Sequence, residues 1–137
     1  MNIFKIFDIA GSGMSAQSVR LNTIASNLAN ANVTNSSPDK AYRSRQPVFA
    51  TVLDSANRDQ TSAAVKVAGI VESRAPVRKE YAPHHPQADQ DGYIYTSNVN
   101  VVEEMANMIS ASRSYQANVE VLNTSKQLLL NTLRIGQ

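Results

Sequence analysis

Two adjacent histidines, His84 and His85, have the side chains best suited to chemistry in this sequence. Imidazole nitrogens bind transition metals, and a histidine beside a carboxylate can act as a general base. Both lie between Pro83 and Pro86, where we expect an extended, polyproline-like connector. Adjacent side chains of an extended chain point to opposite sides and form a poor pair of metal ligands. We therefore predict no metal site and no catalytic residue here.

The acidic residues also lack the spacing of a catalytic or cofactor site. The motif Asp89-Gln-Asp-Gly92 resembles the start of a calcium loop, but the remaining ligands and the terminal glutamate are missing. It is better interpreted as a tight turn at Gly92. Glu103 and Glu104 would occupy the first turn of a helix, where they favour the positive end of its dipole. The chain has no cysteine, which excludes disulfides and thiolate metal sites. We expect no cofactor and no small-molecule substrate.

A group of basic residues near two tyrosines is the only pattern that suggests nucleic-acid binding, because stacking platforms combine such residues. Acidic residues are interleaved with them, and the formal net charge of the chain is only +2. A solvated or protein-binding surface is the better interpretation, and no nucleic-acid partner is expected. The basic residues are Arg43, Arg45, Arg74, Arg78 and Lys79.

Both ends of the chain have apolar residues at alternating steps of three and four, the spacing of a coiled-coil seam. The first seam covers residues 7–31 and predicts a helix of roughly 37 Å, and the second starts at Val101 and predicts one of roughly 50 Å. Asn100 is expected to cap the second helix. The residues predicted to form an assembly interface are Met14, Leu21, Ile24, Leu28, Val101, Met105, Met108, Tyr115, Val119, Leu122, Leu129 and Leu133.

Between the two seams, the pattern changes to period two and to short apolar runs separated by turn residues. Short strands are predicted at residues 48–53, 65–71, 77–81 and 93–96, with loops at 35–39 and 55–62.

These elements predict a mainly α protein, in which long N- and C-terminal helices pair as a coiled coil around a small β-rich insert. The expected parts are an N-terminal helix in residues 1–33, the insert in 34–97 and a C-terminal helix in 98–137, which forms one unit with the first.

The N-terminal helix has few charges for a solvated helix. Between Ala10 and Asn32 the only charged residue is Arg20, and serine, asparagine, threonine, alanine and glycine fill most positions outside the seam. Serine, asparagine, threonine and glycine are poor helix formers, so the segment should be marginal in water unless neighbours pack against it. No stretch has the hydropathy of a membrane span, and residues 1–8 lack the apolar core of a cleaved signal. We expect a chain that is not inserted in a membrane and keeps its N-terminus.

Two sequence strings, one near each end, resemble the signatures of flagellar rod and hook subunits, the axial proteins of the bacterial flagellum. The first is Ser26-Asn-Leu-Ala-Asn-Ala-Asn32, preceded by Ser12-Gly-Met-Ser-Ala-Gln17. The second is Asn98-Val-Asn-Val-Val-Glu-Glu-Met105, followed by Ser110-Ala-Ser-Arg-Ser-Tyr-Gln-Ala-Asn118. The loop after Thr34 departs from the common rod pattern and is similar to the longer loop of a proximal rod subunit.

The resemblance implies a structural subunit of the proximal rod in the basal body. Such subunits leave the cytoplasm through the flagellar type III export apparatus without signal cleavage. They polymerise in the periplasm with copies of themselves and with other rod subunits. Their terminal helices line the axial drive shaft, which transmits torque and surrounds the export channel. Head-to-tail contacts that do not close produce such helical assemblies.

Two other functions are compatible with parts of the pattern. A cytoplasmic coiled-coil adaptor would use the same seams to form a dimer, and it should be stably helical at low concentration. A small hydrolase or metal enzyme would use His84 with an acidic neighbour. Neither explains both terminal strings, so we predict a structural protein and not an enzyme.

Overall fold

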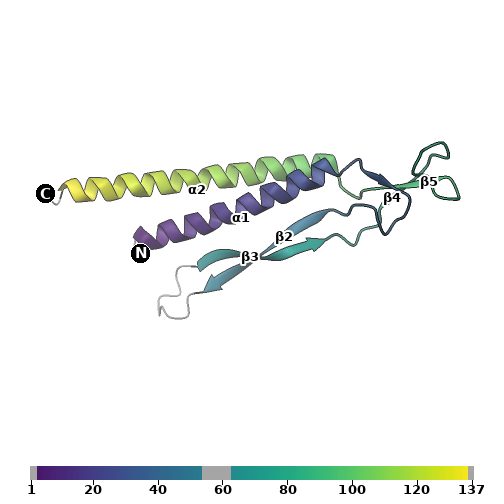
Figure 1. The fold of residues 1–137 in the computed structure, drawn as a ribbon. Helices are drawn as coiled ribbons and strands as arrows, with labels where there is room; N and C mark the ends of the chain where they lie inside the picture. Colours follow the sequence, from purple (N-terminus) through teal and green to yellow (C-terminus); the bar gives the residue numbers. More distant parts are fainter. Residues whose placement is uncertain (1–2, 54–62, 136–137) are drawn as a thin grey trace. The chain divides into compact units, whose positions relative to one another are not determined.

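The computed structural model describes residues 3–53 and 63–135, which form two long helices with five strands between them (Figure 1). The predicted loop at 55–62 lies outside the described residues. The elements are α1 (Ile3–Ala29), β1 (Thr34–Asn35), β2 (Arg45–Leu53), β3 (Ala63–Glu72), β4 (Arg78–Tyr81), β5 (Tyr93–Thr96) and α2 (Val101–Ile135).

The prediction of a mainly α protein with a small β-rich insert is wrong. The strands form two antiparallel sheets, one in the order β1-β5-β4 and one that pairs β2 with β3, so the fold is mixed α and β. All four predicted strands exist, but β2 and β3 extend to 9 and 10 residues. Backbone pairing continues past the apolar runs into polar positions such as Arg45 and Glu72, because ladder hydrogen bonds do not require apolar side chains. The two-residue strand β1 was not predicted.

The three-stranded sheet is held in register around β5. Ile94 is buried and faces Glu80 of β4, while Thr96 pairs with Arg78 on one side and with Thr34 of β1 on the other. The predicted tight turn before β5 is confirmed, since Gly92 has a φ of +82°. This left-handed conformation strains any residue with a Cβ.

The segment between β4 and β5 is not the extended connector predicted from its prolines. Its backbone forms consecutive turns, in which the His85 N–H donates to the Ala82 carbonyl at 3.0 Å and the Ala88 N–H donates to the His85 carbonyl at 2.9 Å. The His85 Nδ1 atom accepts from the Gln87 N–H. Local hydrogen bonds of this kind outweigh the preference for extended backbone next to proline.

Asparagine side chains bind backbone groups at the start of α2 and at the end of α1. Asn100 caps α2 as predicted, because its Oδ1 accepts from the backbone N–H groups of Val102 at 3.1 Å and Glu103 at 3.4 Å. At the end of α1, the Asn30 side chain donates to the Ser26 carbonyl at 2.8 Å and satisfies one of the last helix acceptors. Neither α1 nor α2, over the parts described, is apolar enough over a sufficient length to cross a membrane.

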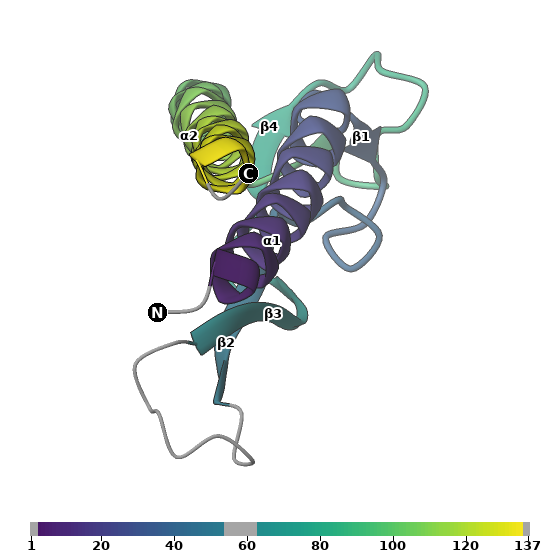
Figure 2. The ribbon, with the colours of Figure 1, turned by 90° about the vertical axis from the view of Figure 1, so that its left-hand side faces the viewer.

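The chain forms two compact units, and both helices and both strands β2 and β3 contribute to each. Unit 1 comprises Met1–Leu21, Pro47–Gly69 and Ile109–Gln137. In this unit α1 runs beside α2, as Figures 1 and 2 show, and a Cβ on Gly13 would lie 2.9 Å from the Asn118 Nδ2 atom. Small residues therefore allow the helices to approach closely, and the buried ones are Ala10, Ala16, Ala111 and Ser125.

Unit 1 also connects α1 to the second sheet. The Ser12 hydroxyl donates to the Ile9 carbonyl at 2.8 Å and accepts from the Val65 N–H of β3 at 3.1 Å. A serine within a helix commonly donates to a carbonyl of the preceding turn. Here its second interaction anchors the edge of β3 to the helix.

Unit 2 comprises Asn22–Gln46 and Ile70–Met108, and it contains the three-stranded sheet with the end of α1 and the start of α2. Its interior combines apolar and polar side chains. The buried apolar residues are Ile24, Ala31, Ala41, Ile94 and Val99, and the buried polar residues are Thr23, Asn27, Ser44, Ser97 and Glu104.

Candidate functional site

The most completely bonded side chain in unit 2 is Asn27, which lies in the last turns of α1 and is fully buried. Its Nδ2 donates to the Arg45 carbonyl at 2.8 Å and to the Glu104 Oε1 at 3.0 Å. Its Oδ1 accepts from the Arg45 N–H and from the Tyr42 hydroxyl, both at 2.9 Å. Both donors and both lone pairs of the amide are used, so the buried group has no unmet polar atom.

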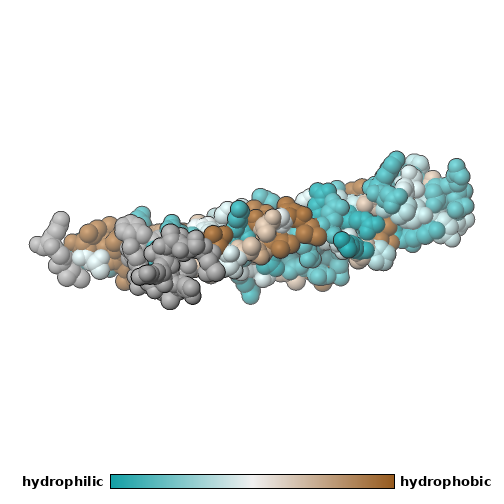
Figure 3. All heavy atoms as spheres, turned by 90° about the horizontal axis from the view of Figure 1, so that it is seen from below, coloured by the Kyte–Doolittle hydropathy of each residue, from teal (hydrophilic) through white to brown (hydrophobic). Residues whose placement is uncertain are grey.

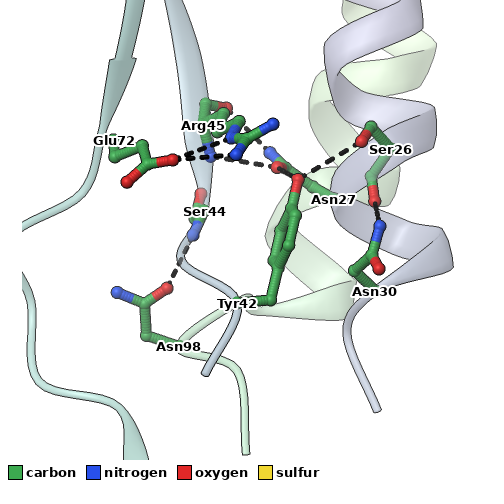
Figure 4. Close-up of polar contacts among 8 residues, drawn as sticks. All are labelled: Ser26, Asn27, Asn30, Tyr42, Ser44, Arg45, Glu72 and Asn98. Atoms are coloured by element: carbon green, nitrogen blue, oxygen red, sulfur yellow. Dashed lines mark hydrogen bonds and ion pairs between the residues drawn. The ribbon is translucent and has the colours of Figure 1, made fainter. Parts of the chain in front are cut away.

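The contacts of Asn27 join α1 to the segment of Tyr42 and Arg45, as Figure 4 shows, and to Glu104 of α2. Arg45 is the first residue of β2, and the Asn27 amide pairs with both its N–H and its carbonyl, as a neighbouring strand would. Glu104 lies in the first turn of α2. We call the group formed by Ser26, Asn27, Tyr42, Ser44, Arg45, Asn98 and Glu104 the polar cluster.

Tyr42 extends the polar cluster to the surface. Its phenol has one proton, which it donates to Asn27, so the Ser26 hydroxyl at 3.3 Å must act as the donor to Tyr42. The Arg45 guanidinium lies 5.5 Å from the centre of the Tyr42 ring and forms an ion pair with Glu72 at 2.9 Å. Both charged side chains are about half exposed, so this ion pair is worth little, about 0–1 kcal/mol.

Ser44 connects the polar cluster to the turn that precedes α2. The Ser44 N–H donates to the Asn98 Oδ1 at 2.8 Å, and the Asn98 amide donates onward to the Ala75 carbonyl at 2.9 Å. The Ser44 carbonyl accepts from the Ser73 N–H at 2.7 Å. Arg78 binds the same turn from β4 through the carbonyls of Ser97 and Val99. These bonds fix the place at which α2 begins.

Glu104 was interpreted from the sequence only as a favourable charge at a helix start, and its role in the polar cluster was missed. It is 5% exposed, and its Oε1 also accepts from the Ser44 hydroxyl at 3.5 Å. The only signal was its place in a row of small or polar residues at steps of seven. That row consists of Glu104, Ala111, Asn118 and Ser125. Such a row carries no apolar periodicity, so it gives no sign of a seam in the sequence.

The polar cluster contains no chemistry beyond hydrogen bonding. Among the described residues, no three His, Asp or Glu side chains lie close enough to hold a metal ion. His84 is exposed in the turns before β5. Three of the basic residues that were considered as nucleic-acid ligands instead bind other groups of the same chain. Arg43 donates to the Ala75 carbonyl, Arg45 pairs with Glu72, and Arg78 holds the turn before α2.

Asp89 forms a second, smaller group of polar contacts in the turn before β5. Its Oδ1 accepts from the N–H groups of Tyr93 at 2.7 Å and Asp91 at 3.0 Å, and its Oδ2 accepts from the Tyr95 hydroxyl at 3.2 Å. The Tyr93 N–H is the main cause that lowers the pKa of this carboxyl. Desolvation opposes the shift, and the Tyr95 hydroxyl, the Asp91 N–H and the Lys79 ammonium add to it.

The residues predicted to form an assembly interface fall into three groups by exposure. Ile24 is buried inside unit 2. Met14, Leu21, Leu28, Met108, Leu122 and Leu129 are half-buried. The exposed ones are Val101, Met105, Tyr115, Val119 and Leu133.

Helix α2 exposes more large apolar side chains than the predicted seam contains. Leu133 is 60% exposed and Val102 is 76% exposed. Figure 3 shows apolar surface at the C-terminal end of α2 and a second apolar area where β2 and β3 face the viewer. Eight of the exposed apolar residues share one side of α2, which we call its apolar face; they are Val101, Val102, Met105, Ile109, Tyr115, Val119, Leu130 and Leu133. Val121 and Leu128 are exposed on another side of the helix.

Comparison with known proteins defines the class of this chain. Residues 7–35 match the family model described as flagella basal body rod protein. Residues 90–135 match the model described as flagellar basal body rod FlgEFG protein C-terminal. The two matches cover both terminal strings and include Asn27 and Glu104, from opposite sides of the polar cluster. Both models describe flagellar rod proteins.

Full-length relatives define the family within that class. The flagellar basal-body rod protein FlgC of Salmonella typhimurium is 52% identical over the whole of both chains, and that of Escherichia coli O6:H1 is 51% identical over the whole of both. The FlgC of Borreliella burgdorferi is 33% identical over 100% of this chain and 99% of its own. This chain therefore belongs to the family of the flagellar basal-body rod protein FlgC.

Membership confirms the resemblance seen in the sequence, and the chain is a structural rod subunit of the flagellar basal body and not an enzyme. As a rod protein it assembles with other rod subunits. The alternative of a cytoplasmic coiled-coil adaptor is not supported.

Proposed function

We propose that this chain polymerises through α1 and α2, and that the two helices form part of the wall of the proximal rod. In that position they would transmit torque along the axial drive shaft and surround the export channel. The observation that carries the proposal is the apolar face of α2, which has no covering element among the described residues. An extended apolar surface of this kind marks a protein-binding site rather than a solvated helix.

Energetics favour burial of the apolar face between subunits. Burying one leucine or valine side chain completely is worth about 1.5–3 kcal/mol. Met105 and Leu130, each about half exposed in the single chain, would gain part of this on assembly. Since every subunit repeats the same contacts, the gain recurs along a polymer.

The predicted interface residues are retained in this proposal with two tasks. The buried and half-buried ones, such as Ile24 and Leu122, stabilise the subunit itself. The exposed ones, such as Met105 and Leu133, contact neighbouring subunits. Residues 1–33 and 98–137 would thus be the axial parts, and residues 34–97 would lie between them in the chain. Whether the helices pair with regular coiled-coil geometry stays a prediction.

We further propose that the chain reaches the periplasm through the flagellar type III export apparatus without cleavage of a signal. Support comes from family membership and from the N-terminal residues, where Lys5 and Asp8 interrupt the apolar positions. Mass spectrometry of the rod-associated protein tests this directly. Loss of an N-terminal peptide of about 20–30 residues, the usual signal length, would contradict the export route.

A pair of adjacent substitutions tests the interface. Ile109→Asp places a charge on the apolar face, where the side chain is 56% exposed, and should abolish rod assembly and motility. Ser110→Asp places the same charge one position further along α2, at an exposed polar residue, and should leave swimming nearly normal. Both variants must accumulate to wild-type levels. Normal swimming of the Ile109→Asp strain would refute the proposed use of this face.

A further inference from the structure

Asn27 and Glu104 are 77 residues apart in the chain, and they meet inside unit 2 from two different helices. The Asn27 Nδ2 and the Glu104 Oε1 are 3.0 Å apart, and the two residues are 0% and 5% exposed. Burying a carboxylate is costly, and an apolar pair of similar size is often equally or more stable. Stability alone therefore does not account for a carboxylate at this position.

Geometry makes the Asn27–Glu104 contact directional. Three of the four hydrogen-bonding positions of the Asn27 amide are occupied by Arg45 and Tyr42, so one N–H is left for α2. Sliding α2 by one helical turn, about 5.4 Å, would place Asn100 or Met108 opposite that N–H. Neither residue is a carboxylate, and Asn100 already caps the helix. One axial position of α2 is thus favoured over its neighbours.

We propose that Asn27 and Glu104 are positioning residues that set the axial register of α2 against α1, and that rod assembly depends on this register. Buried polar pairs between helices have this role in coiled coils, where they select one register at a cost in stability. The inference rests on the proposed function, because register matters only if both helices contact neighbouring subunits. It assigns Asn27 and Glu104 to aligning the apolar face rather than to contacting a partner.

An exchange of the two side-chain types tests the pair in a strain that lacks its own copy of the gene. Asn27→Asp places two carboxylates at the 3.0 Å contact and removes its donor, so basal bodies per cell should fall about tenfold or more. Combining Asn27→Asp with Glu104→Gln restores one amide and one carboxylate, and it should recover a substantial part of the loss. A double variant that assembles no better than Asn27→Asp alone would overturn the proposal.

A second pair of variants separates register from stability. Glu104→Met leaves the buried Asn27 N–H and the Ser44 hydroxyl without their acceptor, so its denaturation midpoint should fall. Its assembly should fall about tenfold, further than that of an Ile94→Ala chain with a similar midpoint. Glu104→Gln keeps an acceptor for Asn27 and should assemble nearly normally. A Glu104→Met strain with as many basal bodies per cell as the wild type would overturn the proposal. So would an assembly defect no larger than that of an Ile94→Ala chain with the same denaturation midpoint, because the carboxylate would then serve stability alone.

Ile94→Ala is the matched control for a general loss of stability. It removes a buried side chain of β5 outside the Asn27–Glu104 pair, and it should lower the denaturation midpoint while rods still assemble. An Ile94→Ala chain as deficient in assembly as Asn27→Asp would assign the defects to stability and overturn the register role. Failure of the Ile109→Asp test alone would instead contradict the proposed interface, so the two proposals are separately testable.

Discussion

The polar cluster and the C-terminal part of α2 reverse the usual distribution of side chains in a protein. In the polar cluster, Asn27 and Glu104 are buried and hydrogen-bonded to three segments of the chain. In α2 beyond residue 119, Leu128 and Leu133 are about 60% exposed. Soluble monomers normally place such residues the other way round. The chain itself completes the first region, whereas we propose that neighbouring subunits cover the second.

This difference separates two sources of stability. The polar cluster should hold the end of α1, the start of β2 and the start of α2 in a single chain, because its hydrogen bonds are all internal. The far part of α2 has no comparable internal contacts among its described residues, apart from small buried ones such as Ser125. We therefore expect the local stability of α2 in the free chain to fall from its N-terminus to its C-terminus.

The largest effect on the free chain is expected from Asn27→Leu. The substitution leaves the Arg45 N–H and carbonyl and the Tyr42 hydroxyl without their buried partner. Each unmet group costs about 1–3 kcal/mol, so the free energy of unfolding should fall by about 3 kcal/mol or more. Urea unfolding followed by circular dichroism measures this. A loss below about 1 kcal/mol, the value of one ordinary hydrogen bond, would contradict the importance of the polar cluster.

A smaller effect is expected from Tyr42→Phe, which removes one hydroxyl and keeps the ring under Arg45. The loss should be about 1 kcal/mol, because Asn27 loses one of its two donors to Oδ1. Tyr115→Phe, at an exposed position of α2, is the matched control and should change stability by about 0.5 kcal/mol or less. Equal effects of the two substitutions would mean that the hydroxyl of Tyr42 has no special role.

A still smaller effect on the free chain is expected from Leu130→Ala. Replacing a buried leucine by alanine lowers the free energy of unfolding by about 2–5 kcal/mol. Replacing an exposed leucine should lower it by about 0.5 kcal/mol or less. Leu130 is 47% exposed in the single chain, and any large cost should emerge only in the assembled rod. A loss of 2 kcal/mol or more in the purified monomer, the range of a core leucine, would show that α2 is already packed there.

The smallest effect concerns pH and the turn before β5. The Tyr93 N–H lowers the pKa of Asp89 in the folded chain, so the ionised carboxyl favours folding. This contribution is fully present above the ordinary pKa of aspartate and is lost as the pH falls through the lowered value. Asp89→Asn should remove the dependence, which a series of unfolding curves at falling pH would reveal. An unchanged acid dependence in the variant would exclude Asp89 as its source.

The helices and strands of this fold could largely be predicted from the sequence. The lengths of β2 and β3 and the buried polar contacts could not. Periodicity and turn residues located both helices, four strands and the cap at Asn100. They underestimated β2 and β3, because backbone pairing extends beyond apolar side chains. They predicted an extended connector around His85, where local hydrogen bonds instead form consecutive turns despite the prolines.

The polar cluster lay beyond sequence reasoning for a different reason. Asn27 and Glu104 have residue types that are usually exposed, and no local pattern shows that residues 77 positions apart will meet. Asn27 did stand in the string that carried the resemblance to flagellar axial proteins, so its importance had a signal but no physical explanation. The structure supplies an explanation, because the side-chain amide of Asn27 uses two donors and two acceptors to bind Tyr42 and Arg45 on one side and Glu104 of α2 on the other.

Amide hydrogen exchange of the purified monomer tests the central claim most directly, because it reports stability along each helix. We predict strong protection at residues 22–29 of α1 and 101–108 of α2, which flank the polar cluster, and weak protection at 119–134. The same amides at 119–134 should become protected in the assembled rod. Uniform protection along α2 in a verified monomer, or none at 22–29 and 101–108, would contradict the account.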